Sequence, residues 1–388
     1  MTKVKYVTRI DQVRGIPEEE LCRLREVTET FAFRSNTYYL GLIDWSDPAD
    51  PIRRVIIPDP EELDDWGALD ASGESAYTVA PGLEHKYQFT AVLLAHDFCG
   101  GFCRFCFRKR LFLEGNTEVT RDVEQGLDYI RRHPEINNVL ITGGDPLMLS
   151  TRRLDYILSR LRGIEHVEII RLGTKMPAFN PYRILDDDRL VEVLSRYTSP
   201  EQRLYAMVHF NHPRELTDPA VRALDRLMRA GLIVANQTPL LRGVNDDPDV
   251  LGDLLNKLSY VGAAPYYVFQ VRPTRGNRHL VVPIEEAISV FEKARGKASG
   301  LARRARLVMS HASGKIEMIG FTGDFVFFRY HRAANPAEKG RFMVFRRNPQ
   351  ATWFDDYLEQ GEVFLESALG GLPVNRMGAE VSVFGPRA

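Results

Sequence analysis

The sequence predicts an α/β fold: a partial (β/α)6 barrel of the TIM type, with a helical and extended N-terminal segment and a C-terminal extension. From residue 91 onward, six apolar, β-branched runs alternate with helix-like segments. Such alternation is typical of parallel strands joined by right-handed crossovers. Six units are fewer than the eight of a closed barrel. The expected strands are 91–97, 138–145, 167–174, 204–210, 232–241 and 266–273, and helices between them include 121–134, 152–163 and 218–231.

The ends of these strands are polar, which is the second observation behind the prediction. The runs lead into HDFCGGFC, TGGDP, LGTK, HFNHP, NQTPLL and QVRPTRG. In barrels of this type the chemistry takes place where strands end and the following loops begin. We therefore expect one site shared by these loops.

The flanking segments are less regular. Residues 17–34 have a Pro, early acids and helical spacing, which predicts a helix. Residues 42–63 are dense in Pro and Asp, which predicts an irregular, extended segment. Past the helix expected over 284–297 the alternation stops, and we expect strands at 342–347 and 380–385 and a helix at 352–369. The predicted division of the chain is 1–90, 91–300 and 301–388.

Composition excludes several classes of protein. The chain has 388 residues, 44% of them apolar and 27% charged, with a net charge of -1. No run of apolar residues is long enough for a bilayer, and the start lacks the apolar core of a secretory signal, so we expect a cytoplasmic protein that does not bind membranes. The near-zero net charge argues against nucleic-acid binding. Four cysteines do not make a disulfide scaffold, and Cys22 is expected to be a buried structural thiol.

The other three cysteines lie close together. Cys99, Cys103 and Cys106 have the spacing C-x3-C-x2-C, and three thiolates can hold zinc or an iron–sulfur cluster. A structural zinc site normally has four protein ligands, and His96 could be the fourth. On a cluster of four irons, three thiolates would leave one iron open to a substrate or cofactor. The spacing favours this open iron–sulfur site and leaves the zinc site as the alternative.

The motif C-x3-C-x2-C just after a first barrel strand resembles the signature of radical S-adenosylmethionine (SAM) enzymes. The resemblance implies a [4Fe-4S] cluster held by Cys99, Cys103 and Cys106, and a 5′-deoxyadenosyl radical made from SAM. TGGDP, at the end of the second strand, is similar to the family motif that contacts SAM, which implies a role for Gly143, Gly144 and Asp145. A simple turn would also explain Gly-Gly-Asp-Pro.

Further stretches resemble the lysine 2,3-aminomutase family. They are DPADPIRRVIIP (47–58), CRFCFRKRLF (103–112), NNVLITGGDPLMLS (137–150), HVEIIRLGTKMP (166–177), HFNHPRELT (209–217), NQTPLLRGVND (236–246), YYVFQVRPTRG (266–276) and SHASGKIEMIG (310–320). The resemblance implies an isomerase that moves the α-amino group of an amino acid to the β-carbon. It also implies pyridoxal 5′-phosphate (PLP) bound to Lys315 in a Gly- and Ser-bearing loop, an electron donor such as flavodoxin or ferredoxin, and a homo-oligomer.

Individual residues follow from the resemblance. Arg108 matches the arginine that holds the substrate α-carboxylate, a task that suits a planar guanidinium. His209 and Gln237 match positions near SAM, although both could be ordinary strand-end polar residues. Lys86 matches one of two basic residues near the PLP phosphate, and the second position is Thr90. Lys109 and Arg110 are expected on a solvated basic face.

The chain departs from the lysine-specific members at the substrate side chain. In the lysine-specific members, two aspartates receive the lysine ammonium. The matching positions in this chain are Arg272 and a residue near Met309. An arginine would repel an ammonium and attract a carboxylate, so we expect glutamate or aspartate as the substrate. The alternative is that Arg272 turns away to pair with an acid. The C-terminal cysteines that hold zinc in the lysine enzymes are also absent. Two other functions stay open at this point: a radical SAM enzyme of another reaction type with PLP lost or repurposed, and a zinc-stabilised binding module.

Overall fold

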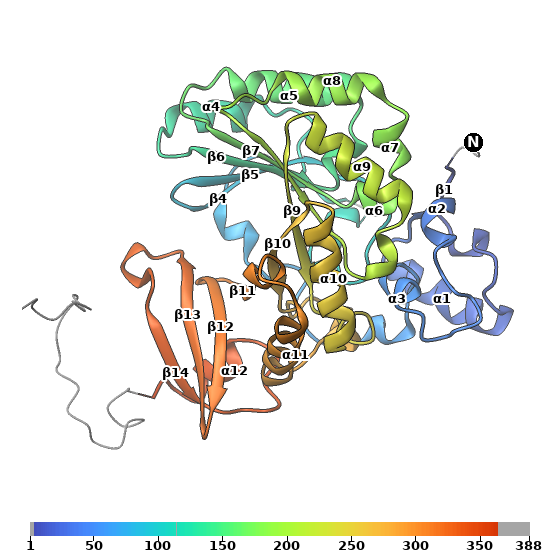
Figure 1. Ribbon diagram of the computed structural model, residues 1–388, viewed down its shortest axis with the longest axis vertical. Helices are drawn as coiled ribbons and strands as arrows, with labels where there is room; N and C mark the ends of the chain where they lie inside the picture. Colours follow the sequence, from blue (N-terminus) through green and yellow to red (C-terminus); the bar gives the residue numbers. More distant parts are fainter. Residues whose placement is uncertain (1–3, 114, 364–388) are drawn as a thin grey trace, which may run out of the picture.

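The computed structural model describes residues 4–113 and 115–363. Its main feature is one twelve-stranded sheet in the order β14-β13-β12-β11-β10-β9-β8-β7-β6-β5-β4-β3 (Figure 1). All six expected strands are present, and each pairs in parallel with the next. They are β5 (Thr90–His96), β6 (Asn138–Gly143), β7 (Ile169–Thr174), β8 (Leu204–Val208), β9 (Ile233–Pro239) and β10 (Ala264–Phe269). The predicted α/β class and six-unit partial barrel are confirmed.

Helices follow the strands and cover the outer side of the sheet (Figure 1). Their bounds are α4 (Glu124–Arg132), α5 (Thr151–Arg162), α6 (Met176–Phe179), α7 (Tyr182–Leu185), α8 (Asp188–Arg196), α9 (Asp218–Arg229), α10 (Pro248–Tyr260) and α11 (Ile284–Lys297). The helices predicted over 121–134, 152–163, 218–231 and 284–297 correspond to α4, α5, α9 and α11. Polar caps start them: Ser150, Asp187 and Thr217 accept hydrogen bonds from the first turns of α5, α8 and α9. The leucines and isoleucines of α5, α8 and α9 pack on the strands in one buried cluster.

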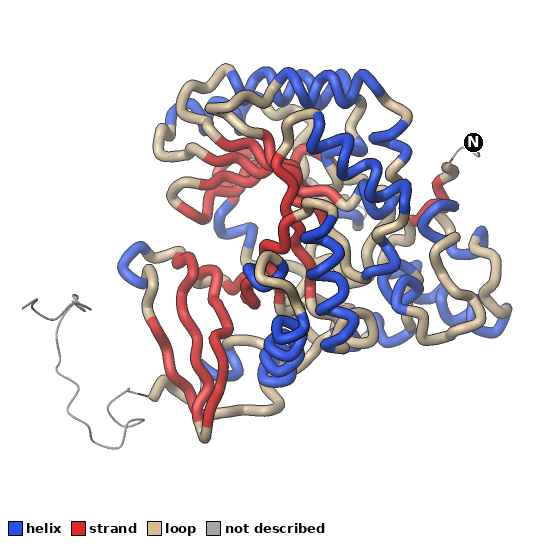
Figure 2. Tube along the Cα trace, in the orientation of Figure 1, coloured by secondary structure: helices blue, strands red, loops and turns tan. Residues whose placement is uncertain are grey.

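The N-terminal segment is built from short helices and loops (Figure 2). Its elements are β1 (Tyr6–Val7), α1 (Glu18–Thr30), β2 (Ser35–Asn36), α2 (Thr37–Leu40) and α3 (Pro51–Ile56), followed by β3 (Thr78–Ala80) and β4 (Leu83–Tyr87). The helix predicted over 17–34 is confirmed as α1.

Two predictions about this segment are wrong. Cys22 is exposed rather than buried, because α1 turns Leu21, Leu24 and Val27 inward instead. The stretch 42–63 is also not purely extended, since it contains α3 and a short 3-10 helix, Pro60–Leu63. Asp50-Pro51 and Asp59-Pro60 each act as an N-cap and first helical residue, so two of the three Asp-Pro pairs that suggested a break begin helices.

The C-terminal extension continues the same sheet. β11 (Arg306–His311) is a seventh parallel strand beside β10, and β12 (Gly314–Thr322), β13 (Phe325–Ala333) and β14 (Phe342–Arg346) follow antiparallel. β14 confirms the strand expected at 342–347. Of the helix expected at 352–369, only α12 (Asp355–Leu358) is helical in the described part. Residues 364–369 and the strand expected at 380–385 lie outside the described residues. The three-part division remains a prediction; the sheet itself runs across both of its boundaries.

Candidate active site

A cavity of ≈ 350 Å³ lies at the carboxyl ends of the parallel strands. Every strand from β4 to β13 contributes at least one residue to the lining of this cavity, as predicted for a shared site. The residues predicted from the sequence that line it are Lys86, Cys99, Cys103, Cys106, Arg108, Gly143, Gly144, Asp145, His209, Gln237, Arg272 and Lys315. The structure thus brings all of them to one place, although the role of each stays a prediction.

The cysteine loop leaves β5 and turns its three thiols to the cavity. All three are partly exposed there, and burial in the protein raises the pKa of each thiol. The N-terminal segment holds the loop in place: Phe102 N donates to Arg34 O at 2.8 Å, and Arg104 N donates to Val55 O at 2.9 Å. Thiols lose their protons when they bind metal, and three thiols on one loop fit an iron–sulfur cluster.

A closed zinc site is the alternative for the same loop. In residues 4–113 and 115–363, no group of three His, Cys, Asp or Glu side chains is placed to hold a single metal ion. A structural zinc ion normally has four protein ligands, and the loop itself supplies three thiols.

Gly143 and Gly144 let the TGGDP loop pack directly on the cysteine loop. Gly143 has a φ of +103°, and a Cβ at Gly144 would lie 2.3 Å from the carbonyl oxygen of Phe98. Asp145 N donates to the same oxygen at 2.8 Å. The Asp145 carboxylate accepts hydrogen bonds from Thr174 Oγ1 and from the backbone of Leu147 and Lys175. Asp145 therefore fastens β6 to β7 beside the cysteines, which is more than a simple turn would require.

His209 and Gln237, at the ends of β8 and β9, also face the cavity. Burial, with the charge of Lys175 nearby, lowers the pKa of His209 to about 3, so its imidazole is neutral. The Lys175 ammonium is held by Glu215 Oε1 at 2.6 Å and Asn211 Oδ1 at 2.6 Å. This wall of the cavity offers neutral polar groups backed by a satisfied ion pair.

Lys315 lies on β12 and not in a loop, which corrects the sequence-based expectation. Gly314 forms the start of the strand, and Lys315 pairs with Ser310 on β11 and Arg332 on β13. Its Nζ lies 4.2 Å from the centre of the Tyr267 ring and 4.7 Å from that of Phe269. Burial, and then the charges of Arg332 and Arg272, place the pKa of Lys315 well below its ordinary value. A partly buried amine whose pKa is lowered reaches its unprotonated form more readily, and that form is a nucleophile toward carbonyl carbons.

Arg108 enters the cavity wall as part of a charged network. Its guanidinium binds Glu74 at 2.7 and 3.1 Å, and Glu84 lies 3.6 Å away. Glu74 also accepts from Arg110 at 2.8 Å. Glu74 and Glu84 were missed by sequence analysis. Glu84 could have been found, because it lies two residues before Lys86 on β4 and so shares its face of the strand.

Lys109 and Arg110 are buried, with 7% and 6% of their surface exposed, so the prediction of a solvated basic face is wrong. Lys109 donates to the carbonyl of Gly276 at 3.2 Å and lies 3.6 Å from Glu62. Arg110 has Glu74 and Glu118 as partners. This run of basic residues is buried because acidic residues from other segments neutralise it. Such pairing cannot be recognised from the neighbouring residues in the sequence.

Arg272, after β10, lies flat on the Phe107 ring, with its guanidinium carbon 3.6 Å from the ring centre. It donates to the Ser72 hydroxyl. Among the described residues it forms no ion pair, so the alternative in which it turns away to an acid is not observed. Met309 is buried in the apolar cluster of the C-terminal strands, whereas its neighbour Ser310 lines the cavity.

Lys86 donates to the carbonyl of His311 at 2.7 Å, and burial lowers its pKa to about 8. Two further cations face the same part of the cavity, and sequence analysis missed both. Arg171 comes from β7 and Arg332 from β13. Arg332 Nη2 donates to Thr90 Oγ1 at 3.0 Å. Nothing local marks Arg332, since it lies in an ordinary strand of the extension.

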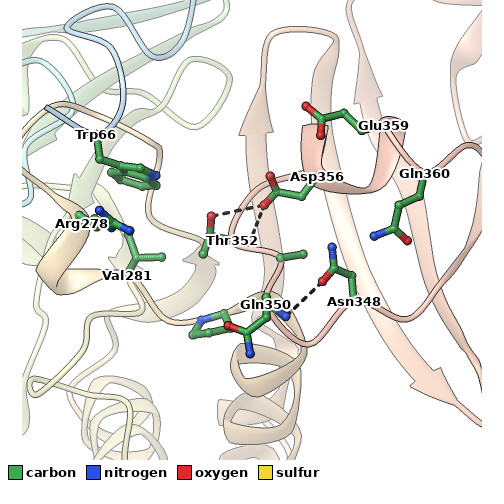
Figure 3. Close-up of a pocket in the computed structure, with 11 residues that line it drawn as sticks. Trp66, Arg278, Val281, Asn348, Gln350, Thr352, Asp356, Glu359 and Gln360 are labelled. Carbon is green, nitrogen blue, oxygen red and sulfur yellow. Dashed lines mark hydrogen bonds between the residues drawn. The ribbon is translucent and has the colours of Figure 1, made fainter.

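A second cavity lies between the segment after β10 and the loops around α12 (Figure 3). Thr352 N donates there to the Asp356 carboxylate at 2.7 Å. None of the predicted site residues lines this cavity. The predicted site residues therefore gather at the first cavity.

The fold and the three-cysteine loop define a radical SAM protein. A profile of the Radical SAM superfamily matches residues 94–255, from β5 to within α10. Members of this superfamily bind a [4Fe-4S] cluster and SAM, and the cysteine loop fits that cluster.

Three relatives narrow the family. A putative L-lysine 2,3-aminomutase of Aquifex aeolicus is 57% identical over 92% of this chain and 96% of its own length. L-lysine 2,3-aminomutase of Clostridium subterminale is 35% identical over 77% of this chain and 71% of its own. Glutamate 2,3-aminomutase of Clostridioides difficile is 32% identical over 80% and 73%. The chain belongs to the lysine 2,3-aminomutase family of radical SAM enzymes, and is an isomerase. No helix in the described ranges has the length and apolar character of a membrane span.

Proposed function

We propose that this protein is a PLP-dependent amino acid 2,3-aminomutase whose substrate carries an acidic side chain. The observation that carries the proposal is the convergence of three thiols, the partly buried Lys315 and Arg108 on one cavity. The reaction exchanges a hydrogen on the β-carbon for the amino group on the α-carbon, so substrate and product have the same atoms and oxidation state. The sequence-based alternative, a radical SAM enzyme with PLP lost or repurposed, gives no role to Lys315 in the cavity.

The residues of the cavity fit both cofactors. When bound, the cluster and SAM supply a primary carbon radical, and PLP supplies a conjugated carbonyl that carries the migrating nitrogen. Lys315 is suited to PLP because its side chain is partly buried, lacks an acidic partner among the described residues, and has a lowered pKa. Tyr267 and Phe269 shield it with aromatic surface and limit the access of water.

Arg108 would hold the α-carboxylate of the substrate. Glu74 grips the guanidinium through two hydrogen bonds, which restricts its orientation, and both groups are buried. A planar fork held in this way positions a carboxylate with two hydrogen bonds. Glu74 is then a positioning residue that acts through Arg108.

Arg272 would receive the side-chain carboxylate. Its guanidinium faces the cavity, is held flat on Phe107 and has no acidic partner among the described residues. A lysine ammonium at this point would meet a like charge at a cost of several kcal/mol. Ser310, beside Lys315, is neutral and adds no negative charge. These contacts support glutamate or aspartate over lysine.

The remaining expectations concern partners. A radical SAM enzyme needs a reductant, and we expect a flavodoxin or ferredoxin in the cytoplasm to supply the electron. We also expect that copies of the chain associate as a homo-oligomer.

The test uses anaerobically reconstituted protein with iron, sulfide, PLP and a reductant. Borohydride treatment followed by peptide mass spectrometry should place a phosphopyridoxyl group on Lys315 in the wild type and none on Lys315→Ala. With SAM and separate glutamate, aspartate and lysine, the expected products are β-amino acids from an acidic substrate. A wild-type protein that binds the cluster and cleaves SAM but is never labelled by PLP would favour the alternative enzyme.

A further inference from the structure

The end of the cavity near Lys315 carries an excess of positive charge. Lys86, Arg171, Arg332 and Lys315 all line it, from β4, β7, β13 and β12. Within the described residues, none of the four forms an ion pair with a carboxylate. Burial and the charge of Arg332 lower the pKa of Arg171 to about 10, and the same arginine lowers the pKa of Lys315. All four side chains are partly buried, and charges withdrawn from water are normally paired, so this group favours an anion from outside the chain.

Arg332 lies beside a position where the sequence lacks an expected basic residue. The basic position expected four residues after Lys86 is Thr90, at the start of β5. Arg332 Nη2 donates to the Thr90 hydroxyl at 3.0 Å, and its guanidinium carbon lies 4.3 Å from the centre of the Tyr87 ring. The C-terminal extension therefore brings a guanidinium to the place where the N-terminal side of the barrel has none.

The strand register of the C-terminal extension directs the Arg332 side chain toward the cavity. Lys315 and Arg332 are directly paired on β12 and β13, and paired residues of antiparallel strands point to the same face of the sheet. Arg171, on β7, lines the same cavity, and its Nε donates to Asn138 Oδ1 at 2.8 Å. No hydrogen bond among the described residues uses the two Nη atoms of Arg171, which are free to bind a ligand.

We propose that Arg332, together with Arg171 and Lys86, binds the phosphate dianion of the cofactor attached to Lys315, so that the C-terminal extension completes the cofactor site. The inference rests on the proposed function. Two guanidinium forks and one ammonium suit a dianion with three acceptor oxygens. A substrate carboxylate would carry only half of that charge, and in the proposed function Arg108 and Arg272 take the two carboxylates of the substrate.

The test compares PLP with pyridoxal, which lacks the phosphate. Binding to the full-length protein is measured by absorbance titration, with Arg332→Ala, Arg332→Lys and, as a matched control, Arg346→Ala. Arg346 is exposed at the end of β14 and does not line the cavity. We expect Arg332→Ala to raise the Kd for PLP by about tenfold or more while the Kd for pyridoxal stays within about twofold, since one charge-assisted contact is lost. Arg332→Lys should fall between, because an ammonium keeps the charge without the fork.

An equal loss of PLP and pyridoxal binding in Arg332→Ala, or no loss of either, would overturn the inference. If that variant does not fold, judged by its melting temperature against Arg346→Ala, Arg171→Gln provides the same comparison. Stabilisation by inorganic phosphate tests this inference independently of the proposed function. Should PLP never label Lys315, phosphate that stabilises the wild type but not Arg332→Ala would still support the anion site. Equal stabilisation of both proteins would count against it.

Discussion

Glu84 Oε2 lies 3.6 Å from Arg108 Nη2, and the other oxygen of the same carboxyl group, Oε1, is buried without a hydrogen-bond partner among the described residues. Burial, opposed by the charge of Arg108 and assisted by that of Glu74, raises the pKa of Glu84 to about 7. The guanidinium assigned to the substrate carboxylate thus has one permanent acidic partner and one that titrates near neutral pH.

This relationship predicts the pH dependence of substrate binding. Below pH 7 Glu84 is protonated and leaves Arg108 free to attract a second carboxylate, whereas above pH 7 it is ionised and repels one. The KM for an acidic substrate should rise by up to about tenfold per pH unit above pH 7 in the wild type, and stay nearly flat between pH 6 and 8.5 in Glu84→Gln. Identical pH profiles for the two proteins would show that Glu84 does not govern binding.

The cluster should depend on three of the four cysteines. Replacing Cys99, Cys103 or Cys106 by Ala leaves two thiolates on the loop, so iron content after anaerobic reconstitution should fall to near zero. Cys22→Ala is the matched control, because Cys22 is exposed on α1 and absent from the cavity. Iron loss in Cys22→Ala, or normal iron content in any loop variant, would contradict the assignment of ligands.

Glu74 should be important for stability as well as for orientation. Glu74→Gln leaves Arg108 and Arg110 buried with a weaker partner, and breaking such a pair costs about 3 kcal/mol. Glu118→Gln, which affects Arg110 from the more exposed side, should cost about 0.5 kcal/mol. Thermal denaturation of the two variants measures the difference, and equal melting temperatures would refute it.

The same ion pair predicts behaviour in acid. Although burial alone would raise it, the charge and hydrogen bonds of Arg108 lower the pKa of Glu74 to about 2. A lowered pKa contributes stability that is present above the unfolded-state pKa of about 4.5 and is lost as the pH falls toward 2. Between pH 4.5 and 2 the wild type should therefore lose stability relative to Glu74→Gln, and parallel curves would contradict this.

Substrate preference should follow Arg272. Arg272→Asp replaces a cation facing the cavity by an anion, so activity with glutamate or aspartate should fall and any activity with lysine should rise, measured side by side as kcat/KM. Arg275→Asp is the control, since Arg275 pairs with Asp65 at the exposed surface. An unchanged preference in Arg272→Asp would end the proposal of an acidic substrate.

Sequence analysis succeeded where the signal is local. The six parallel strands were predictable because each combines an apolar run with a polar end, and the cysteine loop because its three thiols are close in the chain. It failed where one local pattern has two outcomes. Asp50-Pro51 and Asp59-Pro60 can break a chain or start a helix, and here they start helices.

The charge arrangement of the cavity was the part that sequence could not supply. Lys109 and Arg110 are buried because Glu62, Glu74 and Glu118 come from other segments to neutralise them. Arg332 is 242 residues from the threonine it contacts.

The sequence by itself determined the α/β class, the family and the set of groups available for the chemistry, because strand periodicity and short motifs are properties of neighbouring residues. Only the tertiary structure decided which cations lack acidic partners, that Lys315 lies on a strand, and that the extension places Arg332 beside Thr90. These depend on strand register and on the curvature of a twelve-stranded sheet, which bring together side chains that no local pattern connects.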